Sequence, residues 1–189
     1  MIIETEQYRR WSKNDYVRMA ETGILADGER TELFEGVILT LSPNNPPHAN
    51  SVSRLTMMLA KYFQEKIVRV QLPLDVSDHS LPEPDFAIVA ADALQDDAHP
   101  QTADLVIEVA DSSLKFDRTE KMSLYARAKI PEYWIVNVAD RVLEVYREPA
   151  EDSQASLGWA YRRREVFEPE QAVCPLALQQ AEFSVAQMF

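Results

Sequence analysis

Two acidic residues lie next to apolar sequence, and an acid in that setting is a candidate for metal chemistry. Glu108 interrupts the apolar run Leu105–Ala110, which is typical of a buried strand. Asp85 follows a proline and directly precedes the apolar segment Phe86–Val89. An ionised carboxylate inside an apolar sheet is costly unless it is paired, protonated or bound to a metal. If the two strands are neighbours, both carboxylates could converge on a hard cation such as Mg²⁺.

A site of this kind would hydrolyse phosphoesters, but each acid also has a simpler interpretation. Mg²⁺ takes one or two carboxylates together with waters and phosphate oxygens, and it activates water for in-line displacement at phosphorus. Alternatively, Glu108 lies on an edge strand whose face opens to solvent. Asp85 could equally be a turn or capping residue after Pro84. The combination of the two acids favours the metal site.

A lysine on a predicted helix could supply the positive charge of such a site. Asp117, Lys121 and Tyr125 are four residues apart and share one helix face. The ammonium could then orient the attacking water or stabilise a pentacovalent phosphate. The alternative is an N-capping Asp117 with Glu120 three residues later, plus an exposed Asp–Lys pair that contributes little to stability.

Composition places these residues in a soluble globular protein. The chain has 189 residues, 46% of them hydrophobic and 26% charged, and we expect one domain over residues 1–189. Its single cysteine, Cys174, excludes an intramolecular disulfide and a Cys-rich zinc site, and fits a reducing cytoplasm. No apolar run approaches the roughly 18 residues that cross a membrane. We therefore expect a cytoplasmic protein with no membrane partner.

The charge balance restricts how the protein could act on nucleic acid. With 19 basic and 31 acidic residues, the formal net charge is −12. Bare phosphate is repelled by such a protein, so a role in coating nucleic acid is disfavoured. An acidic enzyme can still act on DNA if a metal neutralises its carboxylates or if it carries a local basic patch.

The elements that must position these residues follow from periodicity and turn chemistry. Strands dominate the middle of the chain and helices are inserted among them, so we predict an α/β fold built on one mixed β-sheet flanked by helices. By residue number, the expected elements are a short helix that Ser12 caps and Gly23 ends, a hairpin over 32–41 turning near Gly36, a helix over 48–66, strands over 67–77, 86–91 and 105–110, a helix over 117–129, and strands over 133–138, 142–147 and 161–167.

Several motifs follow one another in an order and spacing that point to a known family. They are Thr31–Ile38, His48 after a proline-rich loop, Pro84–Val89, Leu105–Val109 with Ser112, the Asp117-x-x-x-Lys121-x-x-x-Tyr125 helix, and Ile130–Val136. In this arrangement nearly the whole chain resembles the Uma2 family of restriction-endonuclease-like proteins, long catalogued as a domain of unknown function. That family belongs to the PD-(D/E)XK nuclease superfamily.

The resemblance implies a restriction-endonuclease-like fold and a Mg²⁺- or Mn²⁺-dependent endonuclease that acts on DNA. Asp85 and Glu108 match the acids of the family and would ligate the metal. Glu32 matches an upstream acid and would complete or support the metal site. Lys121 matches a helical lysine that replaces the superfamily's strand lysine. His48 matches a family histidine near the site, and the sequence assigns it no role.

Departures from the general pattern keep other functions open. Ala110 stands two residues after Glu108, where the superfamily has its lysine, and Lys129 and Asn137 replace residues usual in the family. The rival hypothesis is therefore a non-catalytic nuclease-fold module that binds a protein or nucleic-acid partner. A hydrolase of another phosphoester would have the same site residues. By analogy with nucleases that cut two strands related by a dyad, a homodimer is favoured.

Overall fold

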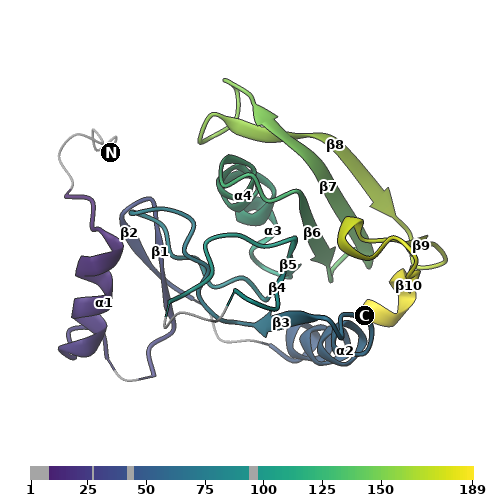
Figure 1. Ribbon diagram of the computed structural model, residues 1–189, viewed down its shortest axis with the longest axis horizontal. Helices are drawn as coiled ribbons and strands as arrows, with labels where there is room; N and C mark the ends of the chain where they lie inside the picture. The colour runs from purple at the N-terminus through teal and green to yellow at the C-terminus, as the bar shows by residue number, and fades with distance from the viewer. Residues whose placement is uncertain (1–8, 27, 42–44, 94–97) are drawn as a thin grey trace.

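The core of the molecule is a six-stranded mixed sheet. A computed structural model describes residues 9–26, 28–41, 45–93 and 98–189. The strands lie in the order in which they occur along the chain, and only the β5–β6 pair is parallel among the described strands (Figure 1). They are β3 (Lys66–Val70), β4 (Phe86–Ala90), β5 (Leu105–Ala110), β6 (Glu132–Asn137), β7 (Val142–Glu151) and β8 (Trp159–Phe167).

One face of the sheet is covered by helix α2 (Pro46–Tyr62) and by C-terminal segments (Figure 1). Asn45 caps the helix, and its side chain accepts a hydrogen bond from the His48 amide at 3.1 Å. Leu55 and Leu59 are fully buried, and each contributes about 1.5–3 kcal/mol by leaving water. The C-terminal segments are β9 (Ala172–Val173), the 3₁₀ turn η3 (Leu176–Leu178), β10 (Phe183–Ser184) and the 3₁₀ turn η4 (Val185–Met188).

The other face is covered by a helical segment of three parts, α3 (Leu114–Phe116), the π turn η2 (Asp117–Lys121) and α4 (Met122–Arg127). In the π turn, the Met122 amide donates to the Asp117 carbonyl five residues earlier. Tyr125 and Tyr133 pack here, with ring centroids 5.1 Å apart. Lys121 and Tyr125 point from the helical segment toward the sheet, since both donate a hydrogen bond to Glu108 in β5.

Strand β5 lies inside the sheet, between β4 and β6. Its side chains alternate as predicted, since Leu105, Ile107 and Val109 pack in the core under α2, whereas Val106 and Ala110 pack in the core under α4. Glu108 shares the second face and is only 4% exposed. The alternative of an exposed edge strand for Glu108 is therefore wrong.

The N-terminal elements form a smaller layer beside the sheet (Figure 1). Helix α1 (Lys13–Glu21) begins with the Ser12 capping box, as predicted. The hairpin consists of β1 (Thr31–Phe34) and β2 (Val37–Thr40), and its turn at Gly36 has a left-handed φ of 78°. The Leu81 amide donates to the Leu33 carbonyl at 2.8 Å, which fixes the hairpin against the segment before β4.

Several predicted elements differ from the structure. The helix predicted over 48–66 ends at Tyr62, with Lys66 already in β3, and the strand predicted over 142–147 extends to Glu151. The strand predicted over 67–77 ends at Val70, because Gln71 adopts a left-handed φ of 49° and Pro73 follows. The helix predicted from Asp117 begins at Leu114, so Asp117 is not its N-cap. Its carboxylate instead accepts a hydrogen bond from the Ser113 hydroxyl.

Within the described residues, none of the helices has the length and apolar character that crossing a membrane requires.

Candidate active site

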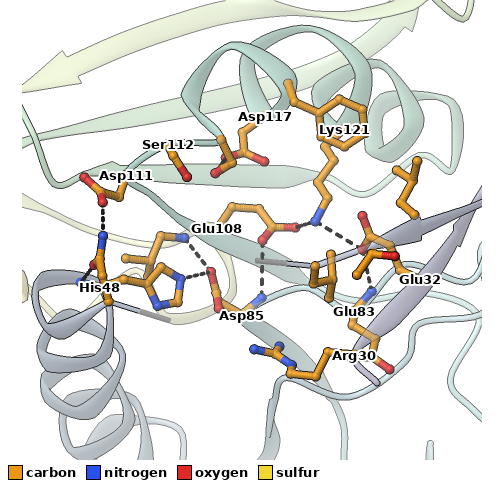
Figure 2. A pocket seen from close by; sticks show the side chains of 17 residues that line it. Arg30, Glu32, His48, Glu83, Asp85, Glu108, Asp111, Ser112, Asp117 and Lys121 are labelled. Carbon is orange, nitrogen blue, oxygen red and sulfur yellow. Dashed lines mark hydrogen bonds and ion pairs between the residues drawn. The ribbon is translucent and has the colours of Figure 1, made fainter. Parts of the chain in front are cut away.

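The five residues that the sequence singled out line one pocket of about 460 Å³. Figure 2 shows them converging from separate elements, with the hairpin on one side, the start of α2 on another, and the helical segment above. The structure thus brings together side chains that are far apart along the chain. They are Glu32, His48, Asp85, Glu108 and Lys121.

Asp85 precedes β4 and is held by three hydrogen bonds. Its Oδ2 accepts from the Val109 amide at 2.8 Å and from His48 Nε2 at 3.2 Å, and its Oδ1 accepts from Gln71 Nε2 at 3.0 Å. Burial acts to raise the pKa of Asp85, but the bonds from His48, Gln71 and Val109 outweigh burial and lower it. The acid is an ionised carboxylate tied to the neighbouring strand, so the alternative of a local turn cap is wrong.

Glu108 lies beside Asp85 on the next strand, with its carboxylate inside the protein. The Asp85 amide donates to Glu108 Oε2 at 3.4 Å, while Lys121 Nζ at 3.1 Å and the Tyr125 hydroxyl at 2.8 Å donate to Oε1. Burial raises the pKa of Glu108 to about 8; Lys121 opposes this shift and the nearby Asp117 adds to it. Glu108 thus holds its proton far more tightly than an ordinary glutamate.

Lys121 connects two acids from opposite sides of the site. Its Nζ is 3.1 Å from Glu108 Oε1 and 3.3 Å from Glu32 Oε2 (Figure 2). Burial acts to lower the pKa of Lys121, but the charges of Glu108, Glu32 and Asp117 outweigh it and raise the pKa. Asp117 and Lys121 are only 2% and 6% exposed, so the alternative of an exposed Asp–Lys pair is wrong.

Glu32 faces Lys121, and the hairpin determines that placement. Its Oε2 accepts from the Glu83 amide at 3.1 Å in addition to the contact with Lys121. Because Leu33 is bonded to Leu81, the residue before it in β1 lies next to the segment that leads to Asp85. Glu32 therefore supports the lysine.

Asp117 adds a further buried acid above the pocket. Burial raises the pKa of Asp117 to about 6, although Lys121 and the bond from Ser113 oppose the shift, and Asp85 and Glu32 add to it. Among the described residues, six acids line the pocket together with Arg30 and Lys121, so the pocket carries an excess of negative charge when its acids are ionised. This excess of negative charge favours binding of a cation.

The chain matches a family model described as "Putative restriction endonuclease" (Uma2) over residues 8–186. The chain belongs to the Uma2 family. Membership agrees with the resemblance deduced from the motifs above. A search of curated proteins found no match.

A solved structure has a similar fold. The chain is similar to the crystal structure of a putative nuclease belonging to DUF820 from Anabaena variabilis, with a TM-score of 0.71 and 15% sequence identity. The comparison covers 94% of this chain and 97% of that one. This confirms the predicted restriction-endonuclease-like fold, in which a mixed sheet is flanked by helices.

Two contacts that hold the site of this Uma2 chain were not predicted from the sequence. Gln71 binds Asp85, and no sequence signal predicted that the chain turns there into the left-handed region. Tyr125 was predicted to share the face of Lys121, and its bond to Glu108 follows from that placement. Its helical spacing was therefore the signal that could have identified it.

The donor set determines which metal site is feasible. Among the described residues, no group of three or more His, Cys, Asp or Glu side chains is placed to hold a metal ion. Asp85 and Glu108 remain as two carboxylates that each have an oxygen carrying a single hydrogen bond from the described residues, Oδ1 and Oε2. Two hard oxygens completed by water and phosphate oxygens suit Mg²⁺ or Mn²⁺.

Proposed function

We propose that the protein is a divalent-metal-dependent endonuclease that hydrolyses phosphodiester bonds in DNA. One observation carries the proposal: Glu108, in β5, accepts a hydrogen bond from the backbone amide of Asp85, directly before β4, and both acids line one pocket beside a buried lysine. Family membership and the nuclease-like fold support it. Asp85, Glu108, Lys121 and Glu32 are the proposed functional residues.

Asp85 and Glu108 would hold Mg²⁺ or Mn²⁺. When bound, the ion would supply a more acidic water and stabilise the charge that develops on phosphate. The protein's own contribution is to orient both carboxylates before the ion arrives. Gln71, His48 and the Val109 amide fix Asp85, and Tyr125 and Lys121 fix Glu108.

Lys121 would act as a cation and not as a base. The raised pKa keeps its ammonium protonated at neutral pH, so it is unsuited to abstracting a proton from water. An ammonium has three N–H donors, and the carboxylates of Glu108 and Glu32 lie within reach of two of them. The third can donate to a non-bridging phosphate oxygen, and this bond would strengthen as charge accumulates there.

Glu32 would keep Lys121 in place. Without Glu32, the lysine would have a single carboxylate partner and could turn toward the solvent side of the pocket. This supporting role matches the observation that Glu32 contacts Lys121 and the Glu83 amide.

The rival function is a non-catalytic nuclease-fold module that binds a protein or nucleic-acid partner. The net charge of −12 and Ala110 in place of a strand lysine favour it. The buried lysine between two acids argues against it, because a binding module gains nothing from such a costly arrangement. Hydrolysis of another phosphoester would use the same residues.

We also infer the compartment and the oligomeric state of the proposed enzyme. The single Cys174 fits a reducing cytoplasm, and the nuclease analogy favours a homodimer.

Plasmid nicking tests the proposal. Supercoiled plasmid with Mg²⁺ or Mn²⁺ should be nicked by the wild type and by a Lys66→Met control. Lys66 begins β3 at the end away from Asp85, and it pairs with Asp104. Asp85→Asn and Lys121→Met should lose at least about a hundredfold in rate. Equal nicking by all four proteins would reveal a contaminant, and no nicking with either ion would favour the binding module.

A further inference from the structure

We propose that the site acts on DNA that is unpaired at the point of cleavage, such as a single strand, a flap or a frayed end. The inference rests on the proposed nuclease function and specifies its substrate. Three features of the pocket carry it, namely the depth of the reactive groups, an apolar wall and the charge of the lining.

The reactive groups lie at the floor of the pocket. The side chains of Asp85, Glu108 and Lys121 are 11%, 5% and 8% exposed. A scissile phosphate must therefore enter a recess to reach them. A continuous duplex can present a phosphate there only by bending or opening, which costs free energy, whereas an unpaired strand is flexible.

A hydrogen-bonded bridge between two elements borders the recess. The Asn45 side chain, at the start of α2, donates a hydrogen bond to the Asp111 carboxylate, just after β5 (Figure 2). Both residues line the pocket. The bridge holds the start of α2 next to the segment after β5, so these two parts of the pocket lining are fixed relative to each other.

An apolar wall faces these polar groups. Leu39 and Leu41, from the hairpin side, and Phe116, from α3, line the same pocket. The Phe116 ring packs on the buried Phe34 with centroids 5.1 Å apart, so it is supported from behind. Apolar side chains contribute nothing to binding a phosphate, whereas an unpaired base can stack on an aromatic ring.

The lining charge disfavours a substrate that brings many phosphates. Six acids and two basic residues line the pocket among the described residues. A duplex would place phosphates of both strands against these acids, whereas one unpaired nucleotide brings a single phosphate and a neutral base. The lining acids are Glu32, Glu83, Asp85, Glu108, Asp111 and Asp117, and the basic residues are Arg30 and Lys121.

The test compares matched substrates with the full-length protein. Labelled oligonucleotides of one sequence are supplied as a single strand, as a flap and as a blunt duplex, with Mn²⁺ as the metal. We expect the single strand and the flap to be cut at least about tenfold faster than the duplex interior. A duplex cut as fast as the single strand would overturn this inference and leave the nuclease proposal intact. Failure to cut any of the three would overturn both.

A variant of the apolar wall separates stacking from folding. Phe116→Ala should lower kcat/KM on the single strand about tenfold, and Phe116→Tyr should restore it. Phe167→Ala removes the same ring from the edge of the core, outside the pocket lining, and should not change the preference for unpaired DNA. Anisotropy of the labelled single strand, measured with Ca²⁺, should show the same loss of binding for Phe116→Ala alone. Equal losses in both alanine variants would overturn the stacking role.

Discussion

The hydroxyl of Tyr125 donates a 2.8 Å hydrogen bond to Glu108 Oε1, the oxygen that also accepts from Lys121. Both side chains are buried, so the bond forms where water does not compete. It turns the second oxygen of Glu108 toward Asp85, whose amide donates to it. A tyrosine on one helix thus orients an acid that we propose to be a metal ligand.

Removal of that hydroxyl should weaken metal binding more than folding. Tyr125→Phe keeps the ring and loses a hydrogen bond to a charged group, and bonds of that kind contribute about 1.5–3 kcal/mol. We expect the Mg²⁺ or Mn²⁺ affinity measured by calorimetry to fall about tenfold or more. Tyr133→Phe is the control, because Tyr133 is equally buried but donates to the Asp117 carbonyl. Equal metal affinities for the two variants would refute the orienting role of Tyr125.

The stability of the metal-free protein should fall with rising pH because of Glu108. Burial raises its pKa from an ordinary 4.5 to about 8, so the folded state binds more protons than the unfolded state between these values. The stabilisation is thus complete below about pH 4.5 and is lost as the pH rises through 8. In urea denaturation, wild type should lose stability relative to Glu108→Gln by at most about 1.4 kcal/mol per pH unit. If the difference in the free energy of unfolding between wild type and Glu108→Gln stays constant from pH 5 to pH 8, the pKa of Glu108 is not raised as stated.

Loss of the Lys121 charge should destabilise the fold, and bound Mg²⁺ should restore part of the lost stability. Lys121→Met leaves Glu32 and Glu108 buried without their shared cation, and breaking a buried pair costs about 3–5 kcal/mol. We expect a loss of this order at pH 8 and a smaller one at pH 5, where Glu108 is protonated. Lys66→Met removes a more exposed pair with Asp104 and should cost less than about 1 kcal/mol. If Mg²⁺ leaves the Lys121→Met melting temperature unchanged, the acids do not bind it.

The stability of the hairpin that carries Glu32 should require glycine at position 36. A Cβ added there would lie 2.5 Å from Arg10 Cβ, and the residue has a φ of 78°. Gly158 has a similar φ of 76°, but a Cβ there meets nothing within 4 Å among the described residues. Thermal denaturation should therefore show a loss of about 1 kcal/mol for Gly158→Ala and a clearly larger loss for Gly36→Ala. Similar losses of stability in the two variants would mean that the hairpin accommodates a Cβ at position 36 without strain.

Much of the fold and site could be predicted because local rules and tertiary packing agree. The alternation in β5 placed Glu108 on the face opposite Leu105, and the structure has it there. Helical spacing put Lys121 and Tyr125 on one face, and both reach Glu108. Neighbouring strands then bring Asp85 to the same place.

Other features depend on contacts that leave no local signal. β3 ends early because Gln71 adopts a left-handed backbone conformation. Its side chain donates a hydrogen bond to Asp85, and this long-range contact has no signal in the local sequence. The helical segment begins at Leu114, before the π turn at Asp117, and no residue pattern marks either feature. Glu32 reaches Lys121 because Leu81 bonds to the hairpin, and such a long-range pairing is not visible in the spacing of residues.

The proposed metal site is tested most directly by anomalous diffraction from crystals soaked in Mn²⁺. We predict one strong peak in the pocket, about 2.1 Å from a carboxylate oxygen of Asp85 and from one of Glu108, and no such peak in crystals of Asp85→Asn. An ordered pocket without a peak at high Mn²⁺ concentration, or a peak that contacts neither acid, would contradict the shared metal site.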